Sequence, residues 1–150
     1  MSDMRAVSQR MGPRDLLVAV SQKFPLPGKN LAAVSRVVDA HLGRLHRRGQ
    51  IADSYAGPAH DRGTGRALAP TDPGGDVLVV RVEVIAADVN PGLQAGIAAL
   101  RSGLRAAVAA LPDQFGPEQA AQLLATVGGD AMSVSWANRT EVRIRDGLFP

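Results

Sequence analysis

The 150-residue sequence contains no cysteine, which excludes disulfide bonds, thiolate nucleophiles and cysteine-based zinc sites. Aromatic residues make up only 3% of the chain, so leucine, valine, isoleucine and alanine must fill the core. No run of about 18 apolar residues occurs, and residues 1–15 lack the apolar segment of a secretion signal. The sequence therefore favours one compact unit, or two small ones sharing a core, in a reducing compartment.

Lysine is nearly absent, so arginine carries almost all of the positive charge, and that charge is unevenly placed. Residues 1–71 contain 11 basic and 5 acidic residues, whereas residues 72–150 contain 6 basic and 9 acidic ones. Arginine binds phosphate and carboxylate groups through two hydrogen bonds at once, which lysine cannot do. The asymmetry favours a polyanion or an acidic partner for the N-terminal half, with a merely solvated basic face as the alternative.

The first element is predicted to be a short helix over residues 14–24. Pro13 suits the first helical position, and Asp15 places an acid in the first turn. Apolar residues then recur at a spacing that one helix face would share: Leu16, Leu17, Val20 and Phe24. Pro25 is expected to end this helix.

A longer helix is predicted from Asn30, which can cap it, to Gly49, which supplies a stop. An apolar stripe follows helical spacing through Leu31, Val34, Val38, His41, Leu42 and Leu45. At about 100° per residue, four arginines fall within a sector of roughly 120° opposite that stripe: Arg36, Arg44, Arg47 and Arg48. These arginines are the candidate binding residues for nucleic acid or for an acidic partner.

Regular periodicity vanishes over residues 52–76, where glycine or proline stands at nearly every third position. We predict a loop or arm of more than 20 residues, a feature that is uncommon in compact domains and usually functional or disordered. This arm separates a basic helical segment, residues 1–51, from a sheet domain, residues 77–150, and the two are expected to share one core. Three arm residues are candidate subunit contacts: Tyr55, Arg62 and Arg66.

The C-terminal half predicts an antiparallel sheet with helices over its apolar face, and hence an α+β fold in the order β-α-α-β-β. Residues 77–86 alternate as a strand, and helices are predicted over 90–111 and 116–127. Alternating residues then predict a hairpin over 131–145. Trp136 lies on the apolar side of that hairpin, so core packing is the first interpretation and an interface anchor the second.

No arrangement of residues indicates an active site. His41 and His46 would point about 140° apart on one helix and cannot share a metal ion alone. His60 and Asp61 form a lone pair in the arm, and the glycines at 63–68 neither follow a strand nor open a helix. We therefore predict no catalytic residue, no metal, no cofactor and no small-molecule substrate, and hence no enzyme.

Residues 14–52 resemble a winged-helix module of the kind appended to metallo-β-lactamase-fold hydrolases. The resemblance rests on a Leu-rich first segment, a proline break and a long helix ending in HLGRLHRRGQI, followed by a Gly-rich segment at the place of a wing. It implies that Arg44, Arg47 and Arg48 lie along a phosphate backbone. Because residues able to read base edges are scarce, only non-specific duplex binding would follow.

The segment DVLVVRVEVIAADVNPGLQAGIAALRSGLRAAV and the hairpin predicted after it resemble small α+β proteins that build the neck or terminate the tail of long-tailed bacteriophages. This resemblance implies a non-enzymatic ring component in a virion or a bacterial cytoplasm. Its partners would be copies of itself, other particle proteins and DNA, with no membrane. The apolar C-terminal residues Leu148 and Phe149 complete the candidate subunit contacts.

Overall fold

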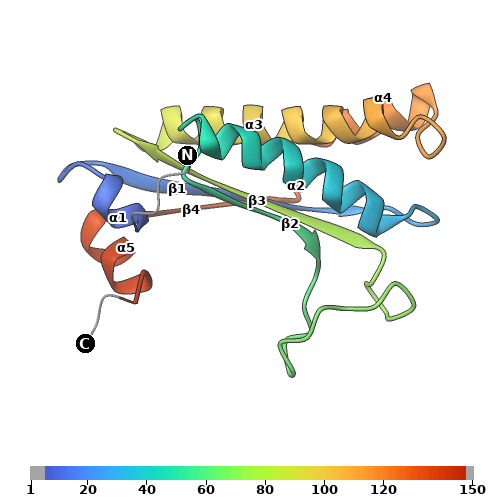
Figure 1. Ribbon diagram of the computed structural model, residues 1–150, viewed down its shortest axis with the longest axis horizontal. Helices are drawn as coiled ribbons and strands as arrows, with labels where there is room; N and C mark the ends of the chain where they lie inside the picture. The colour runs from blue at the N-terminus through green and yellow to red at the C-terminus, as the bar shows by residue number, and fades with distance from the viewer. Residues whose placement is uncertain (1–5, 148–150) are drawn as a thin grey trace.

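Residues 6–147, described by a computed structural model, form a four-stranded antiparallel sheet with helices on both of its faces (Figure 1). In chain order the elements are α1 (Val7–Arg10), β1 (Leu16–Pro25), α2 (Leu31–Arg47), β2 (Asp53–Pro58), β3 (Val77–Ala86), α3 (Val89–Ala110), α4 (Pro117–Ala125), β4 (Met132–Asn138) and α5 (Arg139–Arg145). The α+β class is confirmed.

The strand order across the sheet is β2-β3-β1-β4, and every neighbouring pair is antiparallel. The central elements thus follow a split β-α-β-β-α-β arrangement, with α2 and α3 side by side on one face (Figure 1). Two of the four strands come from before residue 59, so the predicted sequence of strands was wrong in detail. Each half of the chain contributes one central and one outer strand.

The helix predicted over residues 14–24 is wrong, because this segment is strand β1. Leu16, Val20 and Phe24 stand four residues apart, a spacing that fits a helix face and equally an alternating strand. Val18 and Val20 are β-branched, which favours the strand. In the sheet, Val18, Val20 and Phe24 are fully or almost fully buried on the face that carries α2 and α3.

The arm is shorter than predicted, because Asp53–Pro58 is strand β2, paired along β3. Residues 59–76 project below the sheet (Figure 1). Their turns are internally hydrogen-bonded: the Asp61 carboxylate accepts from the backbone of Gly63 and Thr64, and the Asp72 carboxylate accepts from Ala69. A Cβ on Gly75 would lie 1.8 Å from the Ala69 carbonyl oxygen, so only glycine fits this turn.

The helix predicted from residue 30 is confirmed as α2, and the Asn30 side chain accepts a hydrogen bond from the Ala33 backbone N–H. The helices predicted over 90–111 and 116–127 are confirmed as α3 and α4. One buried cluster joins β1, α2, β3, α3 and the region around α4, so the core includes residues from both sides of the arm.

The second strand of the predicted hairpin is wrong, because residues after Asn138 form helix α5. Asn138 accepts a hydrogen bond from the Glu141 N–H, and the Glu141 side chain accepts one from Asn138 N–H, a capping box that begins a helix. Val142 is buried whereas Ile144 is 50% exposed, which is consistent with two residues on different helix faces.

Helices α1 and α5 lie beneath one end of the sheet, on the face opposite α2 and α3 (Figure 1). A small second cluster joins them to the sheet, and it contains Val7, Met11, Leu17, Ala52 and Val142. Ser8 N–H donates to the Asp146 carboxylate at 3.0 Å, which ties α1 to the end of α5. Burial opposes ionisation of Asp146, but hydrogen bonds from Ser8 and the charge of Arg145 hold its pKa below the usual value.

Candidate interaction surfaces

The predicted cationic face of α2 is present on the outer surface of the helix layer. Arg36, Arg44, Arg47 and Arg48 are all exposed, and none forms an ion pair with another residue of 6–147. Apart from a contact of 3.4 Å between Arg44 Nη2 and His41 Nδ1, the exposed guanidinium groups keep their hydrogen-bond donors available for phosphate or carboxylate oxygens from outside the described residues. This face can therefore bind anions.

His41 lies between this cationic face and α3, where its Nε2 and the Ser102 hydroxyl are hydrogen-bonded. Burial lowers the pKa of His41 from 6.5, and the charges of Arg44 and Arg48 lower it further. Although His41 falls in the predicted apolar stripe, it is thus a partly buried, hydrogen-bonded residue between two helices.

A titration of His41 by NMR is expected to give a midpoint below 6.5. Between the folded-state pKa of His41 and its unfolded-state value of about 6.5, the folded state binds fewer protons than the unfolded state. The free energy of unfolding therefore falls as the pH is lowered through this range. The change is expected to be less than about 1 kcal/mol, because His41 is only partly buried. Replacing Arg44 and Arg48 by alanine should raise the midpoint; an unchanged midpoint would contradict the electrostatic explanation.

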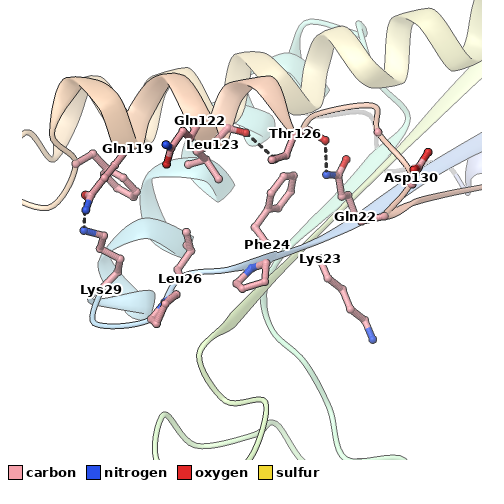
Figure 2. A pocket seen from close by; sticks show the side chains of 15 residues that line it. Gln22, Lys23, Phe24, Leu26, Lys29, Gln119, Gln122, Leu123, Thr126 and Asp130 are labelled. Atoms are coloured by element: carbon pink, nitrogen blue, oxygen red, sulfur yellow. Dashed lines mark hydrogen bonds between the residues drawn. The ribbon is translucent and has the colours of Figure 1, made fainter.

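A groove of about 640 Å³ opens between the end of β1 and helix α4 (Figure 2). Its lining is mainly apolar and includes Phe24, Leu26, Phe115 and Leu123. Strand β4 reaches only as far as Gln22 along β1, so the last residues of β1 have no neighbouring strand on this side. The groove can therefore accept apolar side chains.

Buried Gln22 closes one end of the groove. Its side-chain Nε2 donates to the Thr126 carbonyl at 2.8 Å (Figure 2). Its Oε1 accepts from Gly128 N–H at 3.1 Å. Near the other end Lys29 donates to the Gln119 side chain at 2.9 Å and lies 5.4 Å from the centre of the Phe115 ring. Sequence reasoning missed this groove, because its walls come from segments about 100 residues apart.

Strand β4 forms one outer edge of the sheet, and Trp136 on this strand is 57% exposed. The interpretation of Trp136 as a core residue is therefore wrong. Trp136 pairs in register with Val18 and shares its face of the sheet, but α3 packs on β1 and β3 and not on β4. An exposed tryptophan beside an open strand edge is typical of contact surfaces.

The remaining described candidate contacts lie on β2 and the arm. Tyr55 is half-buried on β2, where its hydroxyl donates to the Pro58 carbonyl at 2.8 Å and its ring centre lies 6.1 Å from that of His60. Arg62 and Arg66 are exposed on the arm. Leu148 and Phe149 lie outside the described residues.

Among residues 6–147, no group of three or more histidine, aspartate or glutamate side chains is placed to hold a metal ion. Within the same part of the chain, no helix combines the length and the apolar character needed to cross a membrane. Comparison of the chain with protein-family profiles, curated proteins and solved structures found no match in any of the three.

Proposed function

We propose that this chain is a non-enzymatic assembly protein of a phage or phage-like particle, a neck or tail-end ring component that bridges neighbouring subunits. The observation that carries this proposal is the open edge of β4, where Trp136 remains 57% exposed although it lies on the same sheet face as the core. In an isolated subunit, a large apolar side chain beside unpaired backbone groups favours aggregation, whereas in an assembly a neighbouring subunit can cover both.

Two further features support the proposal. The arm, residues 59–76, projects from the sheet and keeps its own hydrogen-bonded turns, as expected of an element that reaches a neighbour (Figure 1). The exposed arginines of α2 suit the wall of a DNA channel or an acidic partner subunit. In a ring each contact is heterologous, which means that two different surfaces of the same chain meet.

Electron microscopy of the purified chain tests this proposal. The expected images show closed rings of a uniform size with a central opening. A field that contains only particles of the size of one chain, at concentrations where the protein remains folded, would contradict it.

A second function, non-specific binding of duplex DNA by a monomer or dimer, is favoured by one observation: the four α2 arginines are exposed and make no ion pair within residues 6–147. Under this hypothesis affinity for a random duplex falls steeply with salt concentration. Replacing Arg44, Arg47 and Arg48 by alanine should reduce the slope of log affinity against log salt by about 3.

The matched control removes the same charge elsewhere, with Arg14, Lys23 and Arg143 replaced by alanine; all three are exposed and lie outside α2 and the arm. A larger loss of slope in the α2 variant than in the control would support the DNA-binding function. Duplex binding that is absent, insensitive to salt or equally weakened in both variants would eliminate it.

A further inference from the structure

Strand β4 lacks two features that usually protect an outer strand. Its sequence, Met132–Asn138, contains no charged residue and no proline, and within residues 6–147 one of its sides has no neighbouring strand. Natural proteins block such edges with lysine, proline, bulges or covering elements, because the unpaired N–H and C=O groups otherwise attract another strand. The free side of β4 is therefore ready to continue the sheet.

Strand β2 is the outer strand at the opposite edge, and it is similar to β4 in length. It has six residues where β4 has seven. Because each neighbouring pair in the order β2-β3-β1-β4 is antiparallel, β2 and β4 run in opposite directions. When one copy follows another edge to edge in the same orientation, β4 of the first copy thus lies antiparallel to β2 of the second.

We infer that β4 of one copy pairs with β2 of the next copy, so that the sheet continues from subunit to subunit around the ring. This inference rests on the proposed function, because a ring needs two different surfaces that meet. The alternative, β4 against β4 in a twofold dimer, leaves the edge of β2 unpaired in every copy. Pairing of β4 with β2 satisfies both edges of every subunit at once.

The same contact covers Trp136. On its helix-bearing face β4 has no helix of its own, whereas β2 packs against α2. The residues on this face of β2 are Ser54, Ala56 and Pro58, which pair in register with buried residues of β3. Continuing the sheet from β4 to β2 brings Trp136 beside the helix-covered edge of the neighbouring copy, where its exposed ring becomes buried.

Disulfide cross-linking tests the inference cleanly, because the chain contains no cysteine. Tyr55 on β2 and Ser133 and Ser135 on β4 share the sheet face opposite α2 and α3. In an antiparallel pair, Tyr55 lies opposite Ser135 when the two strands overlap fully and opposite Ser133 when the register shifts by two residues, so the double variants Y55C/S135C and Y55C/S133C test these two registers. The single variants Y55C, S133C and S135C are the matched controls.

After mild oxidation, at least one double variant is expected to give a ladder of covalent oligomers that ends at the mass of the uncross-linked ring, while the single variants stay unlinked. Dimers from S133C or S135C alone, with nothing larger from the double variants, would show β4–β4 pairing and overturn the inference. Rings that form but yield no cross-link would overturn the inference and leave the proposed function standing. A wild-type chain that stays monomeric would overturn both.

A blocking variant gives an independent measurement. Ser135→Lys places a charge on β4, and circular dichroism checks that the subunit still folds. Its proportion of assembled rings is expected to fall at least tenfold, whereas the equivalent change at an exposed site away from both edges, Gln94→Lys on α3, should leave assembly unchanged. Equal assembly of the folded S135K variant and the control would contradict the proposed edge pairing.

Discussion

Replacing Gly96 by alanine is expected to lower the free energy of unfolding by about 1–3 kcal/mol, although alanine is the better helix former. A Cβ at this position would lie 2.6 Å from Cγ2 of Val20, which is fully buried in β1. Helix α3 can approach the sheet this closely only because its contacting residues are small. The extra methyl group must push α3 away from β1 or displace Val20 in a close-packed core.

The matched control is the same substitution in the other large helix. At Gly43 in α2 a Cβ would meet only the flexible end of Arg47, at 3.4 Å, so Gly43→Ala is expected to stabilise the protein by about 0.5–1 kcal/mol. Chemical denaturation measures both changes. In a double-mutant cycle, Val20→Ala should offset part of the cost of Gly96→Ala. If Gly96→Ala and Gly43→Ala changed the free energy of unfolding in the same direction, the close-packing explanation would be refuted.

Replacing Arg81 and Arg145 together by methionine is expected to destabilise the protein by about 3–5 kcal/mol. Both arginines donate to the same oxygen of Glu83, Arg145 at 2.5 Å and Arg81 at 2.9 Å. Glu83 is only 4% exposed, on the sheet face opposite α2 and α3. Without the two guanidinium groups its carboxylate would be buried and unpaired, and α5 would lose the ion pair that holds it beneath β3.

A third substitution separates the lost ion pair from any other effect of the two methionines. Adding Glu83→Met removes the buried charge, so the triple variant is expected to recover most of the lost stability. Thermal or urea unfolding of the four proteins gives the comparison. A triple variant no more stable than the double variant would show that the unpaired carboxylate is not the cause.

Much of the fold could be predicted because strong periodicity and explicit caps coincide in the sequence. Asn30 marks the start of α2, Pro112 follows α3, and the β-branched run at 77–86 is unambiguous. Strand β1 is predicted as a helix because apolar residues spaced by four fit both the helical period and the alternation of a strand. Strand β2 was missed because Gly57 and Pro58 look like loop residues, and only its pairing with β3 makes it a strand.

The candidate surfaces were predictable to different degrees. The arginine face of α2 follows from helical spacing alone, because four residues of one helix need no tertiary information. The start of α5 could have been recognised, since Asn138 and Glu141 form a capping box in the sequence. The exposure of Trp136 could not be predicted from the sequence, because it depends on which strands α3 covers. The groove beside Gln22 likewise exists only where distant segments meet.

The mass of the purified wild-type chain in solution, measured by sedimentation over a wide concentration range, tests most directly whether this protein acts as a building block. We expect one discrete assembly of more than two copies, in which Trp136 is shielded from a fluorescence quencher. A folded monomer at every concentration, with Trp136 accessible throughout, would contradict it.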